Sequence, residues 1–226
     1  MKKIMDFLPT SLGIIQIILL TVLIVQVNNL TPGRPNSPNV PNNRPPGPPQ
    51  AQRPAPGAVV TEDMNELIKG AQAKGASNGK VTIVKYNSFT CGFCNKVKSV
   101  LNELIKKYPN DVKVVYKHFN RNEIDIKTGE AIECAGEQGK FWPMYEEIFN
   151  KGANGNLPSY AKTIGIDPAK FNSCLSSGKY KNKTIEDTNE GRKFGITGTP
   201  GFVINGKLHV GFRPLEAFEA LIKSEL

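Results

Sequence analysis

The distribution of apolar and polar positions divides the chain into three parts. Residues 7–33 carry no charged side chain, and residues 12–27 within them are almost wholly apolar. Residues 31–57 contain almost nothing that a folded core could bury. From residue 58 onward, apolar side chains recur at the spacings of helices and strands. We therefore predict a transmembrane segment over 1–30, a linker over 31–57 and one folded domain over 58–226.

The first part has the length and composition of a membrane-spanning helix, since about 20 apolar residues cross a bilayer core. Lys2 and Lys3 precede the apolar run, which keeps the N-terminus cytoplasmic and exports the chain after residue 30. A cleaved signal peptide is the alternative. It requires small residues at a cleavage site, and residues 25–29 offer none. We favour an uncleaved signal anchor, and both interpretations export the folded part.

The linker is defined by its prolines, because ten of the chain's 17 prolines lie between Pro32 and Pro56. With Asn, Gly and Arg as the other frequent residues, this part is expected to be disordered or extended as polyproline II. At the polyproline rise it would reach about 80 Å. Such a linker would let an anchored domain search the volume around its attachment point.

The folded domain begins with a strand–helix–strand pattern. Residues 81–86 and 112–119 have strand composition, and residues 91–107 place apolar side chains at helical spacing. A helix between two strands implies a crossover and hence a parallel pair. Before this unit, Thr61 is the expected N-cap of a short helix that carries Met64, Leu67 and Ile68.

Residues 122–194 contain mainly helical signals and are predicted to form an all-helical insert. After it, residues 200–205 and 207–211 flank Asn205-Gly206, a strong signal for a two-residue hairpin. Residues 214–226 then predict an amphipathic helix that closes the chain. Three prolines, Pro143, Pro158 and Pro168, suit first positions of helices in the insert. Asp167 suits an N-cap, and Gly165 and Gly178 suit C-terminal stops.

The sharpest chemical feature is the motif Cys91-Gly92-Phe93-Cys94 at the junction between a strand and a helix. At a helix N-terminus, free N–H groups and the helix dipole stabilise a thiolate on Cys91, and a thiolate is the attacking species in disulfide exchange. Cys94, one turn later, is placed to break the mixed disulfide. A structural disulfide and half of a zinc site are the alternatives. Zinc would require two more ligands at suitable spacing.

Composition narrows the class further. The formal net charge is +9, but the lysines are scattered among acids rather than gathered in basic blocks, which argues against nucleic-acid binding. The four cysteines form an even number, compatible with disulfides in an oxidising compartment. No phosphate loop or serine triad stands out, and His118 and His209 lack a ligand-spaced partner. We expect no metal and no cofactor beyond the cysteine pair.

These features resemble the DsbA-like family of thioredoxin-fold oxidoreductases over residues 60–226. The resemblance is carried by the cysteine motif after a strand, the helical insert, Gly198-Thr199-Pro200 before a hairpin, and the last helix. Two phrases within the insert, residues 138–142 and 171–175, also fit the family. The resemblance implies an α/β thioredoxin-like fold with a helical insert. It further implies that Pro200 is cis and faces the redox pair, and that Thr199 and Pro200 pair with substrate backbone.

The chain departs from the family at the residues that tune its redox chemistry. Gly92-Phe93 stands between the cysteines in place of the histidine and proline of the best-known strong oxidants. Lys85 stands six residues before Cys91, where the family usually places a buried acid. If its ammonium lies beneath the pair, it should lower the pKa of the nearer cysteine. Alternatively, its stem carries the charge to solvent or it loses its proton, and then it has little effect.

Cys134 and Cys174 both fall in the insert, and we predict that they form a structural disulfide. Closing a loop of this length stabilises a fold by ~4 kcal/mol on the chain-entropy model. The alternative is a second redox pair that relays electrons to Cys91 and Cys94.

We therefore expect an extracytoplasmic thiol:disulfide oxidoreductase, on the periplasmic side or outer face of the cytoplasmic membrane. It would act on cysteine-containing exported polypeptides, with Cys91 as nucleophile and Cys94 as resolver, and a membrane redox partner would recycle the pair. A reductase for one dedicated client remains an alternative. A redox-inactive binding or chaperone module is a third possibility, which the intact cysteine pair disfavours.

Overall fold

The structure is a computed structural model that describes residues 55, 57–60 and 63–226. The predicted transmembrane segment and almost all of the predicted linker lie outside the described residues. Within the described residues, no helix is both long enough and apolar enough to cross a bilayer. The chain divides into two compact units, Met1–Pro49 and Gln50–Leu226, and the described residues all belong to the second.

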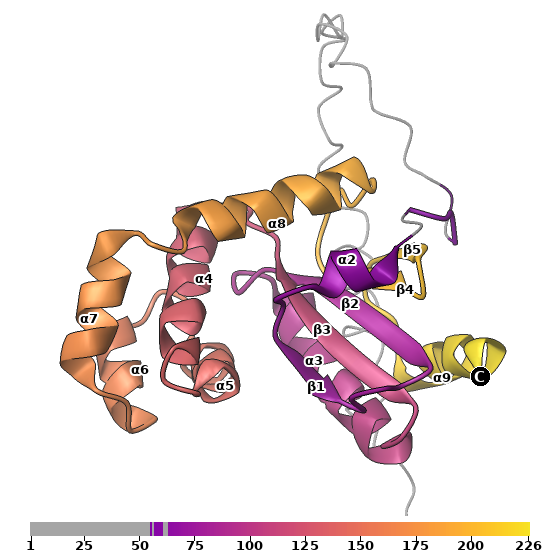
Figure 1. The fold of residues 1–226 in the computed structure, drawn as a ribbon, viewed down its shortest axis with the longest axis horizontal. Coiled ribbons are helices and arrows are strands. Elements are labelled where there is room, and N and C mark those ends of the chain that lie inside the picture. The colour runs from indigo at the N-terminus through magenta and orange to yellow at the C-terminus, as the bar shows by residue number, and fades with distance from the viewer. Residues whose placement is uncertain (1–54, 56, 61–62) are drawn as a thin grey trace, which may run out of the picture. The chain divides into compact units, whose positions relative to one another are not determined.

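A mixed sheet forms the centre of this unit, and across the described residues it has five strands in the order β1-β3-β2-β4-β5 (Figure 1). The central pair, β2 with β3, is parallel, as the strand–helix–strand pattern predicts. The other neighbouring pairs are antiparallel. The strands are β1 (Ala73–Gly75), β2 (Val81–Asn87), β3 (Val112–His118), β4 (Gly201–Ile204) and β5 (Lys207–Val210).

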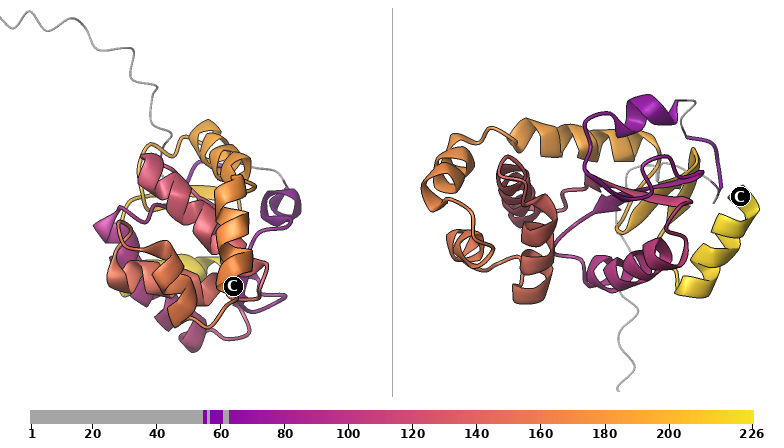
Figure 2. Two further views of the ribbon diagram at one scale, coloured as in Figure 1. Left: turned by 90° about the vertical axis from the view of Figure 1, so that its left-hand side faces the viewer. Right: turned by 60° about the horizontal axis from the view of Figure 1, so that its bottom comes forward.

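The two central strands are buried along almost their whole length, and the buried residues include the polar side chains of Lys85, Asn87, Lys117 and His118. Helices α3 (Gly92–Lys107) and α9 (Leu215–Glu225) cover one face of the sheet (Figure 2). In the contact between α9 and the sheet, the ring of Phe218 lies 5.1 Å from the ring of Phe202 on β4. The short helix α2 (Met64–Ile68) packs on the opposite face through Leu67. This two-faced covering holds β2 rigidly behind the cysteine motif.

All regular structure between β3 and β4 is helical, which is the insert expected there. The last of its helices, α8, runs from the helical group back to the sheet (Figure 1). Asp167 caps α7 as predicted, and Gly178 ends it in the left-handed conformation that glycine adopts without strain. The insert consists of α4 (Glu123–Gly136), α5 (Phe141–Lys151), α6 (Leu157–Thr163), α7 (Pro168–Ser177) and α8 (Lys181–Lys193).

Some details differ from the prediction. Pro143 and Pro158 are the third and second residues of α5 and α6, not the first. The N-cap of α2 is Asp63, whose carboxylate accepts from the N–H groups of Asn65 and Glu66, so the expected cap at Thr61 is wrong. Strand β1 has no predicted counterpart. It is a three-residue edge strand, and a segment that short carries no periodicity that the sequence could reveal.

Candidate active site at Cys91 and Cys94

The cysteine motif lies where β2 ends and α3 begins. Cys91 is the N-cap residue of α3 and has extended backbone angles, while Cys94 lies in the first turn. Strand β4 pairs with β2, so the chain enters β4 beside this junction. The sulfur of Cys91 lies 3.2 Å from the backbone carbonyl oxygen of Thr199, and the Thr199–Pro200 peptide bond is cis, as the resemblance implied. The sheet topology therefore brings two segments separated by more than 100 residues into contact.

The two thiols have opposite electrostatic surroundings. A hydrogen bond from the Cys94 thiol, aided by backbone N–H groups at the start of α3, lowers the pKa of Cys91 to about 5 despite burial. Burial raises the pKa of Cys94 well above its ordinary value, and its hydrogen bond to Cys91 raises it further. Both cysteines carry free thiols in this structure. Cys91 is thus the more readily ionised thiol of the pair by its surroundings as well as by its position.

Lys85 lies beneath the pair, with 2% of its surface exposed. Its Nζ donates to the carbonyl oxygen of Cys94 at 3.2 Å and to the hydroxyl of Tyr145 at 2.8 Å. The alternative in which its stem reaches solvent is therefore wrong. Burial lowers the pKa of Lys85 to about 8, which leaves the amine protonated at neutral pH. Its charge lowers the pKa of Cys94, and its interaction with Cys91 is the weaker of the two.

Gly92 and Phe93, between the cysteines, are both exposed. Phe93 is 55% exposed, and its ring lies 5.9 Å from the ring of Phe212, which follows β5. The ammonium of Lys96 lies over the same ring at 5.4 Å. These two exposed rings, next to the buried Cys91, form an apolar surface that a side chain of another polypeptide can contact.

Cys134 and Cys174 are joined by an S–S bond of 2.04 Å that links α4 to α7. Cys134 is buried in the apolar core of the insert, and Cys174 packs against that core from its edge. The structure therefore pairs these two cysteines with each other and not with the pair at α3.

Sequence reasoning missed two polar groups around the site. The helical pattern places Tyr145 in the insert core, yet its hydroxyl also accepts the hydrogen bond of Lys85. Asp125 is the third residue of α4 and carries no distinctive signal, because an acid in the first turn of a helix is common. Its carboxylate contacts the loop before Cys91. No sequence signal could have linked positions so far apart. In the described part of the chain, no group of His, Cys, Asp and Glu side chains could hold a metal ion.

Comparison with known proteins agrees with this geometry. A family model described as thioredoxin matches residues 69–224. The Na(+)/H(+) antiporter NhaA 1 of Salinispora arenicola is 27% identical over 157 residues, which are 67% of this chain and 24% of that protein. NhaA 3 of Salinispora tropica matches with the same identity and coverage. The chain thus spans about a quarter of the length of these relatives. The ion transport named for them is a property of those proteins.

Solved structures share the fold at low sequence identity. A thioredoxin-like oxidoreductase from Silicibacter pomeroyi has a TM-score of 0.62 at 20% identity, covering 72% of this chain and 96% of its own. Oxidised BdbD from Bacillus subtilis has a TM-score of 0.63 at 21% identity, covering 70% and 94%. The alpha-DsbA1 protein of Wolbachia pipientis has a TM-score of 0.63 at 22% identity, covering 72% and 95%. Because the family model spans more than half of the sequence, this chain belongs to the thioredoxin family, and its fold is that of the DsbA-like proteins.

Proposed function

We propose that this protein is a thiol:disulfide oxidoreductase that forms or rearranges disulfides in exported polypeptides. The observation that carries the proposal is the contrast within one helical turn, where the pKa of Cys91 is lowered to about 5 and that of the buried Cys94 is raised. A pair with equal thiols would have no preferred nucleophile. This contrast makes Cys91 the sulfur that exchanges and Cys94 the sulfur that resolves.

The oxidising reaction follows from this assignment. A client thiolate attacks the Cys91 sulfur of the oxidised protein, which forms a mixed disulfide, breaks the Cys91–Cys94 bond and releases Cys94 as the leaving sulfur. A second client thiolate then attacks the mixed disulfide and releases Cys91 as a thiolate. The client loses two electrons and the protein gains them. The stabilised Cys91 thiolate favours this last step, because a low-pKa thiol is the better leaving group.

Rearrangement uses the same groups in the opposite direction. The Cys91 thiolate attacks a client disulfide, and Cys94 attacks the resulting mixed disulfide when the client does not resolve it. Lys85 favours the Cys94 thiolate that this second attack needs. Thr199 and Pro200 stand beside the Cys91 sulfur, where an extended client segment would align. We propose these two residues as the substrate-binding segment and Gly92 and Phe93 as the residues that set oxidising strength.

The location and partners of the domain follow from the sequence. We propose that the apolar segment over residues 1–30 anchors the protein and that the linker over 31–57 suspends the domain outside the cytoplasm. Clients would then be cysteine-containing exported polypeptides. A redox partner in the membrane would reoxidise the pair after each client.

The test is to trap the mixed disulfide. Full-length protein with Cys94→Ala, in detergent, is incubated with an unfolded polypeptide that carries a disulfide bond, which the Cys91 thiolate attacks with release of one client thiolate. A reducible covalent complex through Cys91 is expected, and its absence together with no exchange between the wild-type protein and glutathione would refute the proposed activity. The equilibrium constant of the wild-type pair with glutathione then separates the oxidant from the alternative, a reductase for one client. Phe93→His, which restores a residue of strong oxidants, should shift that equilibrium toward the reduced protein.

A further inference from the structure

The loop that carries the redox cysteine is tied to the helical insert by one buried carboxylate. Asp125, with 3% of its surface exposed, lies in the first turn of α4. Its oxygens accept from the hydroxyl of Ser88 at 2.9 Å, from the N–H of Thr90 at 3.0 Å and from the hydroxyl of Thr90 at 3.1 Å. The backbone N–H of Arg121 is a fourth donor at 3.0 Å. Ser88 and Thr90 form the connection between β2 and the cysteine motif.

These contacts exceed what a helix cap needs. A carboxylate at the third position of a helix commonly returns to the backbone near its own N-terminus, and the bond from Arg121 is of that kind. The bonds from Ser88 and Thr90 join Asp125 to a different segment, more than 30 residues earlier in the chain. Asn122, the N-cap of α4, adds a bond from its Nδ2 to the Thr90 hydroxyl at 3.2 Å. Burying a carboxylate is costly unless donors satisfy it, so this arrangement has to hold its donors in place.

The loop in turn holds both cysteines. The N–H of Cys91 donates to the carbonyl oxygen of Ser88 at 3.4 Å. Burial raises the pKa of Cys94, and the backbone N–H of Ser88, which hydrogen-bonds the sulfur, opposes that rise. Any movement of Ser88 therefore changes the N–H group that stabilises a Cys94 thiolate.

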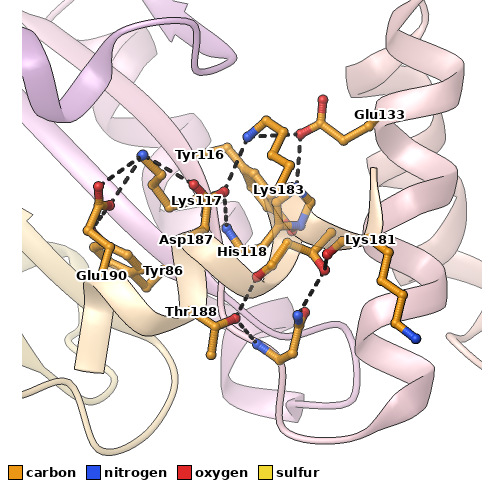
Figure 3. A network of polar contacts seen from close by, with 12 residues as sticks. Tyr86, Tyr116, Lys117, His118, Glu133, Lys181, Lys183, Asp187, Thr188 and Glu190 are labelled. Carbon is orange, nitrogen blue, oxygen red and sulfur yellow. Dashed lines mark hydrogen bonds and ion pairs between the residues drawn. The ribbon is translucent and has the colours of Figure 1, made fainter. Parts of the chain in front are cut away.

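Helix α4 is itself fixed at its other end, so that it can serve as a rigid support. Glu133 Oε1 lies 2.9 Å from Nε2 of His118, at the end of β3, and 3.3 Å from the ammonium of Lys183 on α8. Figure 3 shows Lys183 between Glu133 and Asp187, and Lys117 between Asp187 and Glu190. This network locks α4 and α8 to the sheet, while Asp125 faces the redox loop from the opposite end of the same helix.

We propose that Asp125 is a positioning residue of the redox site, through which the helical insert holds Ser88 and Thr90 and thereby places the backbone N–H that faces the Cys94 sulfur. The inference rests on the proposed function and assigns a residue of the insert to its resolving step. All four groups that donate to Asp125 are uncharged groups of the protein. Asp125 therefore acts by holding these groups in position through hydrogen bonds.

The test uses full-length protein that carries a mixed disulfide between Cys91 and glutathione. Rapid quenching at successive times measures the rate at which Cys94 releases the glutathione. We expect Asp125→Ala to slow resolution about tenfold at neutral pH, because one pKa unit at Cys94 changes its thiolate fraction tenfold. Asp125→Asn keeps an acceptor oxygen and should recover most of the rate. The matched control is Glu130→Gln, which alters another buried carboxylate of the same helix, outside the ion pairs that fix α4 to the sheet, and should leave the rate unchanged.

The possible results separate positioning from its rivals. Equal rates in Asp125→Ala and the wild type would overturn the proposal, and so would an equal slowing in Glu130→Gln, which would indicate a general weakening of the insert. A faster rate in both Asp125 variants would also overturn it, since it would mean that the carboxylate acts as a repelling charge. If Asp125→Ala does not fold, Ser88→Ala removes one of the same bonds from the other side and must slow resolution. Failure of the wild-type protein to exchange with glutathione would refute the proposed function instead.

Discussion

The ammonium of Lys85 donates a hydrogen bond to the backbone carbonyl oxygen of Cys94 at 3.2 Å. Both residues belong to the rigid junction of β2 and α3, and the hydroxyl of Tyr145 holds the same ammonium from the insert. The position at which the family resemblance implied a buried acid thus holds a buried lysine in this chain. Its charge lowers the pKa of Cys94 and so favours the thiolate form of that sulfur.

Lys85→Met, which keeps the volume of the side chain, tests this electrostatic role. We expect the pKa of Cys94 to rise further by about one unit, equivalent to ~1.4 kcal/mol. The small thiolate fraction of Cys94 at neutral pH then falls about tenfold, and resolution of a mixed disulfide at Cys91 slows accordingly. Rapid quenching of the mixed disulfide between Cys91 and glutathione reports that rate. Lys98→Met, which removes an ammonium paired with Glu146, is the control, and equal effects in both variants would contradict a specific role.

The low pKa of Cys91 predicts how reactivity depends on pH. Alkylation of the reduced protein should rise with pH around a midpoint of about 5. Because the hydrogen bond from the Cys94 thiol is the largest cause of the lowered pKa, Cys94→Ala should move the midpoint upward. A midpoint near the ordinary value for a free thiol in the wild-type protein would show that Cys91 is not activated.

The same shift carries a stability prediction with a definite sign. The folded-state pKa of Cys91 lies below its unfolded value, so the reduced fold gains stability that is fully present above the unfolded pKa of about 9. That gain is lost progressively as the pH falls through about 5. Unfolding of the reduced protein by denaturant at several pH values should show the loss. Cys91→Ser, which cannot ionise in this range, should lack it.

The disulfide between α4 and α7 is expected to stabilise the insert and to leave exchange at α3 intact. Cys134→Ser with Cys174→Ser should lower the free energy of unfolding by up to ~4 kcal/mol on the chain-entropy model. Most of the exchange with glutathione should remain, because the structure bonds these cysteines only to each other. Loss of exchange at unchanged thermal stability would instead favour the electron relay.

The buried network between the insert and the sheet predicts a large effect at Asp187. Its carboxylate lies 3.2 Å from the ammonium of Lys117, and both side chains are buried. Asp187→Asn leaves that ammonium with only the half-buried Glu190 and should cost ~3–5 kcal/mol, the usual effect of removing one member of a buried ion pair. Glu66→Gln, which breaks an exposed pair with Lys69, should cost less than ~1 kcal/mol. Equal midpoints in a urea titration would contradict this prediction.

Acid should weaken the same network. Burial favours the neutral form of Asp187, but His118 and the two lysines outweigh it and hold its pKa below the ordinary value. Glu133 behaves in the same way, with His118 and Lys183 opposing burial. Both carboxylates therefore contribute stability that is present above their unfolded pKa values and is lost as the pH falls through their folded ones. Asp187→Asn should make the stability of the protein less sensitive to acid than that of the wild type.

Local patterns in the sequence determined most of the elements of this fold. The apolar run of β2, the helical spacing after Cys91 and the hairpin signal at Asn205-Gly206 all depend on neighbours within a few residues, and the structure has each of them. The position of the cysteine motif at a helix N-terminus is of the same kind, which is why the thiolate on Cys91 could be predicted. The family's motifs added the cis peptide bond at Pro200.

Only the tertiary structure decided which distant groups meet around the thiols. The sequence allowed two positions for the Lys85 ammonium, beneath the cysteine pair or in solvent. Which one it takes depends on Tyr145 and on the packing of the insert against β2. Asp125 carried no signal, since an acid in a first helical turn looks the same whether it faces solvent or a loop more than 30 residues away. Hydrogen bonds and charges act over a few ångströms in space, and spacing along the chain encodes that proximity only within single helices and hairpins.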